Sequence, residues 1–375
     1  MVAHIQKTEY GTYRVQYRDL DGASQSLTFK KKADAKGFLH EMESSKNKGS
    51  YVSPRLGGTL FGDWAKEVQA ALALPLRNST RASDESVLRS LVLPHFEKRR
   101  LASVTTIEVQ GWVSKLSETH SPSTVRKAHQ LLAGVFSAAV NADMLSRTPC
   151  RAIRLPKIER TEMRFLSPVE IDRLANLIDP RYRALVLTAG YTGARFGELA
   201  ALRIGHEGLD LLRKRMTIRA TLTEVRGHLE VGPPKTKAAN RSVSLPRFIV
   251  DELAHHLENH GGDHVFTSPD GKVLRRNNFR RRVWLPAVKA AGLEGVRFHD
   301  LRHSHAAMLI AAGEHPRLIS GRLGHATIRT TLDTYGHLFP GLDEAAADRL
   351  DQLFAEGVGA DRGQITRIAA PVSPP

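Results

Sequence analysis

The chain has 375 residues, and its 55 Lys and Arg against 39 Asp and Glu give a formal net charge of +16 at pH 7. This length predicts two or three domains, and the excess positive charge predicts a polyanionic partner, with nucleic acid as the leading candidate. No stretch approaches the roughly 18 to 20 apolar residues of a membrane-spanning helix, and the opening residues lack the apolar core of a signal peptide. The single cysteine, Cys150, excludes an intrachain disulfide and fits a reducing compartment. We therefore expect a soluble protein that stays in the cytoplasm.

The first segment, residues 1–52, alternates apolar and polar side chains as a half-buried strand does. A second apolar-faced strand and a helix follow, so the sequence predicts a small sheet covered by a helix. The polar strand face is either a solvated surface or a face that enters a DNA groove, as two arginines on one strand allow. The candidate DNA-binding residues on that face are Arg14, Gln16 and Arg18.

Behind a Ser, Pro and Gly linker, residues 56–152 carry apolar positions at helical spacing, which predicts four helices. Pro94 and the sequence SPST at 121–124 are expected to mark helix boundaries. Basic residues on a protein surface are usually only solvated, but those in this segment add to the net positive charge of the chain. Arg126 and Lys127 are the candidate DNA-binding pair in this segment.

A polar linker leads to residues 160–356, which read as mainly helical with one small β-region. Ser167 and Glu170 form a capping box around Pro168, and this pattern predicts a helix start. Alternating apolar residues in 216–222, followed by a turn-rich stretch, predict a hairpin with a lysine-bearing tip. The tail, residues 357–375, contains Gly and Pro and is expected to be disordered.

Polar residues gather in the motifs TGARFGEL, PKTKAANRSV, FHDLRHSHAAMLIAAG and LGHATIRTTLDTYGHLFP. In the first, Arg195 follows a Thr-Gly turn at a helix start, where it and backbone N–H groups can hold an anion. The alternative for Arg195 is an ion pair with Glu198, three residues along. In the third, His299 and Arg302 share one helix face.

The last motif places Tyr335 on the same helix face as Ile328 and Leu332. Spacing alone therefore predicts a core tyrosine whose ring packs against those two side chains. The partners elsewhere in the chain suggest that its hydroxyl also has a chemical role.

Together the motifs contain what breaking a phosphodiester requires: a nucleophile, donors for the phosphate oxygens and a proton for the leaving oxygen. Arginines suit the oxygens, because a planar guanidinium holds two of them and stays charged. Lys235 suits the proton donor, and histidines can assist proton transfer. Tyr335 is then the nucleophile, and nearby cations must ease the loss of its proton.

The sequence HDLRH also places His299 and His303 four residues apart, which superficially matches the zinc-protease pattern H-E-x-x-H. The match is poor, because Asp300 replaces the longer Glu and no further ligand is evident. We expect exposed or capping roles for His303 and His305, and no metal.

The order and wording of these motifs resemble the tyrosine recombinases, specifically phage and mobile-element integrases with an added amino-terminal arm-binding domain. The similarity runs over about residues 1–350 and is strongest from residue 160 onward. The resemblance implies six catalytic positions, which fall on Arg195, Lys235, His299, Arg302, His325 and Tyr335.

Three points qualify that correspondence. Lys237 is the alternative to Lys235, since it lies two residues along and shares its face if the chain is extended. Glu198 would support the first arginine box. His325 and Tyr335 are ten residues apart, where much of the family has nine, so the hydroxyl must stay in line despite one extra residue.

The resemblance implies a multidomain α+β fold in three parts, followed by the tail. Residues 1–52 would be an arm-type DNA-binding domain with a three-stranded sheet plus helix. Residues 56–152 would be a four-helix, SAM-like core-binding domain. Residues 160–356 would be the mainly helical catalytic domain with a small β-sheet, which closes with the core-binding domain as a clamp around the duplex.

The resemblance also implies the reaction and its partners. Tyr335 would form a 3′-phosphotyrosyl link without metal, nucleotide or other cofactor, and a homotetramer would exchange strands through a Holliday junction. The partners would be double-stranded DNA at core-type and arm-type attachment sites, with a DNA-bending host factor and an excisionase, in the nucleoid of a bacterial cell. The amphipathic stretch with Leu350, Leu353 and Phe354 would be a terminal helix that is either passed to a neighbouring protomer or packed on its own domain.

Three other functions remain open from the sequence. They are a DNA-binding protein without catalysis, a zinc hydrolase built on HDLRH, and a type IB topoisomerase of similar chemistry. The arm-like amino-terminal segment argues against the topoisomerase.

Overall fold

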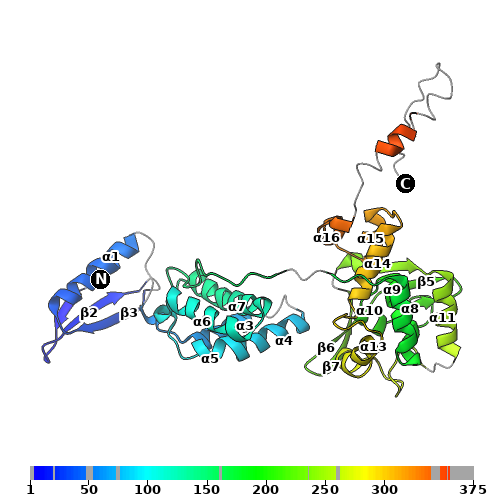
Figure 1. Cartoon of the computed structure of the whole chain (residues 1–375). Helices are drawn as coiled ribbons and strands as arrows, with labels where there is room; N and C mark the ends of the chain where they lie inside the picture. Colours follow the sequence, from blue (N-terminus) through cyan, green and yellow to red (C-terminus); the bar gives the residue numbers. More distant parts are fainter. Residues whose placement is uncertain are drawn as a thin grey trace. The chain divides into compact units, whose positions relative to one another are not determined.

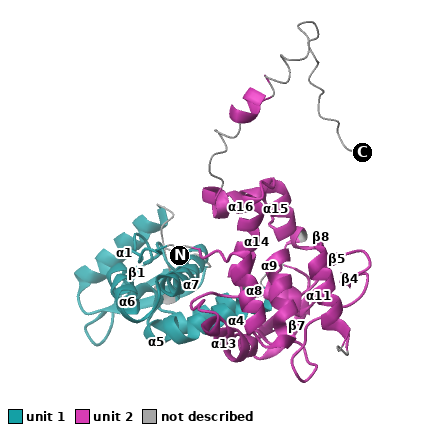
Figure 2. Ribbon diagram, turned by 45° about the vertical axis from the view of Figure 1, so that its right-hand side comes forward, with its two compact units in different colours: residues 1–161 teal, residues 162–375 magenta. Residues whose placement is uncertain are grey.

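Figure 1 shows the computed structural model of the chain. Two compact units divide it, residues 1–161 and residues 162–375 (Figure 2). Each unit has its own buried core, and each is described by itself below. The structure describes residues 4–19, 22–47, 54–72, 77–159, 163–234, 236–258, 262–338, 347–352 and 354.

The first unit opens with a three-stranded antiparallel sheet and one helix, as the sequence predicts. Val15 and Tyr17 are buried against Ala35 and Met42 of the helix, because every second residue of a strand faces the same side. The polar side chains between them lie on the other face. The elements are β1 (His4–Lys7), β2 (Tyr13–Arg18) and β3 (Ser24–Phe29), in the order β1-β2-β3, with α1 (Lys32–Asn47).

A helical bundle follows in the first unit. Its core includes the rings of Phe61, Phe96 and Phe136, whose centroids lie 5.3 to 5.8 Å apart along the pairs that Phe61 makes. Ser121 caps the last helix and Pro122 follows it, as the sequence predicts. The elements are α2 (Pro54–Gly57), α3 (Phe61–Leu72), α4 (Asn78–Val87), α5 (Leu93–Phe96), α6 (Thr106–Thr119) and α7 (Pro122–Asn141).

The expected helix boundary at Pro94 is wrong. The chain stays helical from α4 through a π-turn, Leu88–Val92, directly into α5. Proline has no N–H to donate, and the wider i to i+5 turn ahead of it accommodates the ring without ending the helix. A proline therefore marks a local change of winding here and not an end.

The second unit is mainly helical, and α9 lies at its centre with most of its residues buried, from Ala184 to Gly190. The predicted capping box of Ser167 and Glu170 is present at the start of α8. The helices are α8 (Pro168–Leu177), α9 (Arg183–Thr192), α10 (Phe196–Ala200), α11 (Arg247–Glu258), α12 (Arg276–Phe279), α13 (Leu285–Ala290), α14 (Asp300–Ala311), α15 (Pro316–Leu323) and α16 (Ile328–Tyr335).

The β-region of this unit differs from the single hairpin that the sequence predicts. One three-stranded sheet has the order β4-β5-β8, and a separate two-stranded hairpin is inserted in it. The hairpin turns at Arg226 and Gly227, so its tip carries no lysine, and the lysine-bearing segment instead joins β7 to β8. The strands are β4 (Leu209–Asp210), β5 (Arg215–Ile218), β6 (Thr221–Val225), β7 (His228–Gly232) and β8 (Arg241–Ser244).

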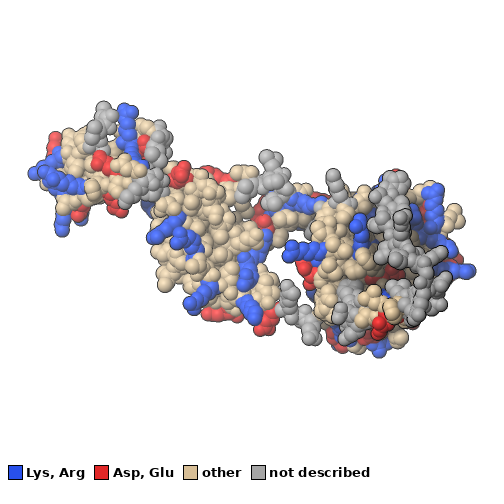
Figure 3. Space-filling view, turned by 90° about the horizontal axis from the view of Figure 1, so that it is seen from above, with Lys and Arg blue, Asp and Glu red and all other residues tan. Residues whose placement is uncertain are grey.

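Towards the carboxyl end, residues 347–352 and 354 are helical, and Leu350 and Phe354 are exposed. Leu353 and the tail at 357–375 lie outside the described residues. In the described part of the chain, no helix is long and apolar enough to cross a membrane. Lys and Arg side chains lie on both units on the face shown in Figure 3, interspersed with Asp and Glu.

Candidate active site

Arg195 stands at the junction of α9 and α10. The left-handed residue Gly193 (φ 67°) ends α9, and Arg195 is the N-cap of α10. Its guanidinium donates to Glu198 Oε1 at 2.8 Å, and its backbone N–H donates to Glu198 Oε2 at 2.9 Å. The ion pair that the sequence left as an alternative is therefore present, while 41% of the Arg195 side chain remains exposed and open to an anion.

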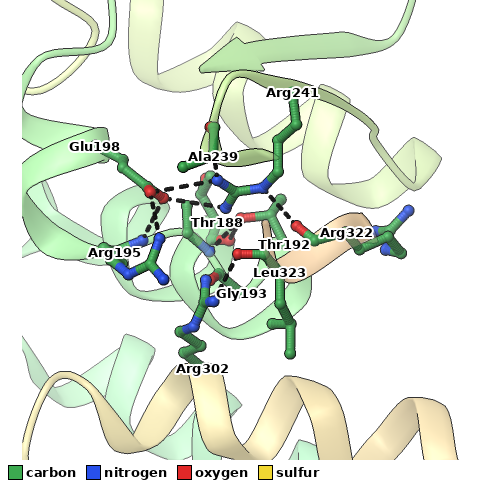
Figure 4. Close-up of polar contacts among 11 residues, drawn as sticks. Thr188, Thr192, Gly193, Arg195, Glu198, Ala239, Arg241, Arg302, Arg322 and Leu323 are labelled. Atoms are coloured by element: carbon green, nitrogen blue, oxygen red, sulfur yellow. Dashed lines mark hydrogen bonds and ion pairs between the residues drawn. The ribbon is translucent and has the colours of Figure 1, made fainter. Parts of the chain in front are cut away.

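Glu198 is shared between two arginines (Figure 4). Arg241, which opens β8, donates to both carboxylate oxygens of Glu198, at 3.0 and 3.3 Å. Burial alone would raise the pKa of Glu198, but the charges of Arg241 and Arg195 hold it below its usual value. Glu198 is thus ionised and fixes the relative positions of the two guanidinium groups.

Arg241 also ties distant segments together. It donates to the carbonyl oxygen of Arg322 in α15 at 2.6 Å and to that of Ala239 in the lysine-bearing segment at 3.2 Å. Only 6% of its side chain is exposed. Sequence reasoning missed this residue, and the available signal was an arginine at an inward-facing position of a strand, between Ala239 and Val243.

Arg302 is buried on α14, with 2% of its surface exposed. It donates to the carbonyl of Gly193 at 2.6 Å and to that of Leu323 at 2.5 Å (Figure 4). Burial, together with the charges of Arg195 and Arg241, lowers the pKa of Arg302 to about 9. These backbone bonds join α14 to the ends of both α9 and α15.

His325 lies in the turn between α15 and α16, after the left-handed Gly324. Its Nδ1 is 2.8 Å from the hydroxyl oxygen of Thr331. Desolvation and the nearby cations Arg302 and Arg195 lower the pKa of His325 to about 4. The imidazole is therefore neutral at pH 7 and can donate one hydrogen bond to a phosphate oxygen.

Tyr335 is the last residue of α16 and is 1% exposed. Burial raises its pKa to about 12, while the charges of Arg302 and Arg195 act in the opposite direction. The expectation that it packs against Ile328 and Leu332 is wrong, because these side chains are 41% and 44% exposed. The buried stripe is rotated about the helix axis, and the ring belongs to a cluster with Ala306, Ile310, Ile319 and Leu323.

His303 and His305 are not the exposed or capping residues that the sequence suggested. The Nδ1 of His303 is 2.8 Å from the hydroxyl oxygen of Tyr335. His305 is 3% exposed and accepts a hydrogen bond from Arg322 Nε at 3.4 Å. His305 is buried and His303 is partly buried, because residues on several sides of α14, and not on one stripe alone, pack against the rest of the unit.

His299 is the N-cap of α14 and keeps an exposed edge. Its ring meets that of His303 edge-on, with centroids 4.9 Å apart. Desolvation and the charges of His303, Arg302 and Arg195 lower its pKa to about 4. Among the described residues, no group of three or more His, Cys, Asp and Glu is placed to hold a metal ion, so HDLRH has no zinc-binding set there.

The remaining candidate residues differ in whether the structure describes them and in what they contact. Lys235 and the side chain of Lys237 lie outside the described residues, although the backbone at Lys237 begins a short 3₁₀ turn. Lys127 forms an ion pair with Asp84 at 2.8 Å, and Arg126 donates to the carbonyl of Pro156. On β2, the side chains of Arg14 and Arg18 are exposed and that of Gln16 is partly so. The structure thus gathers Arg195, Glu198, His299, Arg302, His325 and Tyr335 in the second unit, and the candidate DNA-binding residues Arg14, Gln16, Arg18, Arg126 and Lys127 belong to the first.

Comparisons with known proteins find matches in both units of the chain. The model of the phage integrase family matches residues 164–341, and that of the phage integrase central domain matches residues 61–155. The ICEBs1 integrase of Bacillus subtilis (strain 168) is 29% identical over 282 residues, covering 71% of this chain and 76% of the relative.

Solved structures show the same fold. The Tn1549 transposon integrase in complex with a circular intermediate DNA has a TM-score of 0.67 at 16% identity, over 78% of this chain and 99% of that one. A lambda integrase tetramer bound to a Holliday junction has a TM-score of 0.55 at 17% identity, over 86% and 95%.

The matches to integrase family models and integrase relatives, together with this mainly helical fold, define the class of the tyrosine recombinases. The chain belongs to the phage integrase family. The two family models together match its helical bundle and nearly all of its second unit up to residue 338.

Proposed function

We propose that the protein is a site-specific DNA recombinase that cuts and rejoins DNA through a 3′-phosphotyrosine intermediate, and so integrates and excises a phage or another mobile element. The observation that carries the proposal is the buried hydroxyl of Tyr335, which lies within the electrostatic reach of Arg195 and Arg302. A nucleophile and the cations for its target therefore share one site.

The arginines would hold the scissile phosphate. Arg195 presents a half-exposed guanidinium that Glu198 keeps in place, and Arg302 is held by two backbone carbonyls. Planar donors that never lose their charge at neutral pH suit the two non-bridging oxygens and the charge that grows on them in the transition state. His325, neutral at pH 7, would donate a further hydrogen bond, and His299 would border the same phosphate.

The reaction would proceed in two transfers. The hydroxyl oxygen of Tyr335 attacks phosphorus, the bond to the 5′ oxygen breaks, and Lys235 or Lys237 gives that oxygen a proton. The protein is left joined to the 3′ phosphate. A 5′ hydroxyl of the partner strand then attacks this link, and the bond energy is kept, so the proposed chemistry requires neither metal nor ATP.

Strand exchange would occur in a homotetramer on paired attachment sites, through a Holliday junction. The solved lambda integrase relative is a tetramer bound to such a junction. The exposed apolar residues Leu350 and Phe354 of the terminal helix would contact a neighbouring protomer.

The three parts of the chain would divide DNA recognition between them. Residues 1–52 would bind arm-type sites through the exposed Arg14 and Arg18, residues 56–152 would bind core-type sites, and residues 160–356 would cut. Arg126 and Lys127 would have to exchange their present contacts for phosphates. A DNA-bending factor and an excisionase would set the direction of the reaction in the bacterial cytoplasm.

The test is covalent capture on a nicked attachment site, which traps the protein after cleavage. Wild-type protein should form an adduct in the presence of EDTA and without ATP, and Tyr335→Phe should bind the same DNA but form none. Tyr182→Phe is the matched control, because Tyr182 is also buried in this unit but its ring meets that of Phe279 edge-on. Adducts that persist in Tyr335→Phe contradict the proposal, and tight binding with no adduct from any form favours a DNA-binding protein without catalysis.

A further inference from the structure

The hydroxyl of Tyr335 has a hydrogen-bond partner outside the six positions that the family resemblance implies. In the part of the chain that the structure describes, that partner is His303, whose Nδ1 lies 2.8 Å from the tyrosine oxygen. The two rings meet edge-on, with centroids 5.8 Å apart. His303 follows Arg302 directly in the sequence of α14.

The protonation states fit a bond from tyrosine to histidine. Desolvation lowers the pKa of His303, and the charges of Arg297 and Arg302 lower it further against the opposing effect of Asp300. His303 is therefore neutral, and in the tautomer that carries its proton on Nε2, its Nδ1 accepts a hydrogen bond from the hydroxyl. The groups that face it are Asp300, Arg297, Arg302 and His299 from its own segment, and Tyr335 from α16.

His299 is the other imidazole near the hydroxyl, and it is placed differently. Its ring contacts the ring of His303 at 4.9 Å, so His299 adjoins His303 on the side of the helix start. An acceptor at hydrogen-bond distance from the attacking oxygen is the geometric requirement for a general base. His303 meets that requirement in the structure.

We propose that His303 is a catalytic residue, the general base that takes the proton of Tyr335 during cleavage. As the tyrosine oxygen bonds to phosphorus, its proton passes to Nδ1 of His303, the bond from phosphorus to the 5′ oxygen breaks, and the lysine protonates that oxygen. In the joining step the imidazolium returns its proton to the tyrosine oxygen as that oxygen leaves phosphorus, and the lysine amine takes back the proton of the attacking 5′ hydroxyl. This inference rests on the proposed function.

Phosphate binding would make His303 a stronger base. In the free protein the positive charge of Arg302 disfavours a second cation on His303. A bound phosphate anion offsets the charge of Arg302, and so makes His303 a better proton acceptor when the target bond is present. The tyrosine thus keeps its proton until DNA is in place.

The test compares His303→Ala and His303→Asn in single-turnover cleavage of a nicked attachment site at saturating DNA. Asparagine can still accept the hydrogen bond of the hydroxyl but cannot take the proton, so it separates a base from a residue that only positions Tyr335. Both variants should cleave about 100-fold or more slowly than wild type, with DNA affinity unchanged. His255→Ala, an exposed histidine on α11, should cleave at the wild-type rate.

Two further readouts identify the base. Added imidazole should restore cleavage by His303→Ala in a concentration-dependent way, and raising the pH towards the pKa of the phenol should narrow the gap to wild type. Cleavage by His303→Asn at the wild-type rate, or cleavage by His303→Ala that is unchanged or faster, overturns the proposal. A wild-type protein that forms no adduct overturns the proposed function instead, so the two failures are distinguishable.

Discussion

Three arginine side chains surround one carboxylate in this site. Glu198 pairs with Arg195 and Arg241. The positive charges of these two arginines also act on Arg302. Burial, and after it the charges of Arg195 and Arg241, lower the pKa of Arg302, so holding this cation in the site costs the free protein stability. A phosphate anion relieves that repulsion, so the site favours a bound DNA backbone through its own electrostatics.

Arg241→Met should destabilise the fold and slow cleavage. It leaves the buried Glu198 paired with Arg195 alone and frees the carbonyls of Arg322 and Ala239. Removing one partner of a buried ion pair typically costs about 3 to 5 kcal/mol. Urea unfolding and single-turnover cleavage measure the two effects, and we expect both to change.

The matched control for that variant is Arg215→Met. Arg215 lies on β5, which pairs with β8, but its side chain is exposed. We expect a change of at most about 0.5 kcal/mol there, as for most surface substitutions. Equal effects of the two variants would mean that the contacts of Arg241 do not organise the site.

His305 should make the protein sensitive to acid. Burial and the charges of Arg322 and Arg302 lower its pKa from 6.5 to about 3, so in this interval the unfolded chain binds a proton that the folded chain does not. Stability is therefore lost as the pH falls from 6.5 towards 3, by up to about 4 kcal/mol from this group. Urea unfolding at several pH values should show a shallower dependence in His305→Gln.

Comparing the two proteins isolates this effect. Carboxylates with lowered pKa, such as Glu198 and Asp210, also reduce stability in acid, but they do so in wild type and variant alike. If the free energy of unfolding depends on pH in the same way in wild type and in His305→Gln, His305 is not held neutral by the fold.

Residues in recognisable motifs could be assigned a role from the sequence, whereas residues whose role depends on tertiary contacts could not. Arg195, Arg302 and Tyr335 stand in runs of unusual polar density, so chemistry could be assigned to them from the chain alone. Arg241 and His303 lie in the same motifs, but their roles could not be assigned, because these depend on contacts with Glu198 and Tyr335, which are 43 and 32 residues away. Local spacing carries no signal of such contacts.

At the level of elements, the turn from α15 to α16 brings His325 and Tyr335 to the arginines. Gly324 makes this turn possible, since it has φ 67° and a Cβ there would lie 2.8 Å from Arg241 Nη1 and 3.0 Å from Ala239 Cα. The second contact is with backbone, which cannot swing aside. Close approach and backbone conformation thus both require glycine.

Gly324→Ala should therefore disturb Arg241 and His325 together. We expect a loss of stability beyond the roughly 1 to 2 kcal/mol of a left-handed alanine, and a loss of cleavage. Gly313→Ala is the control for backbone strain alone, because Gly313 has φ 77° and open space around its Cβ position. Similar stability and full activity in both variants would show that the packing at Gly324 is unimportant.

Elements with a local cause were predictable. The capping box at Ser167 and the alternation along β2 are set by neighbours in sequence, and both are present. The hairpin was mispredicted because β5 pairs with β8 across an inserted β6–β7 hairpin, which alternation cannot reveal. Pro94 was misread because a π-turn was not considered.

At the scale of the whole molecule, the net charge of +16 makes DNA affinity a strong function of salt. Each phosphate that a basic side chain neutralises releases a counterion, so we expect affinity to fall by about 1,000-fold or more between 50 and 200 mM salt. Titrations of attachment-site DNA at several salt concentrations measure the slope. Affinity that is independent of salt would exclude the phosphate backbone as the main contact.

Composition thus predicted the class of partner correctly, since the chain belongs to a family of DNA integrases. It could not predict which DNA sequences are bound, because base readout depends on side chains at the groove and not on net charge. The proposed division of labour between residues 1–52, 56–152 and 160–356 is open to the same binding assays with arm-type and core-type DNA.

The most direct test of the account is to map the residue that becomes joined to DNA. Wild-type protein trapped on a nicked attachment site, digested with protease and nuclease, should yield one nucleotide-bearing peptide, modified at Tyr335 through a 3′ phosphate. Modification of any other residue, or a link through a 5′ phosphate, would contradict the account.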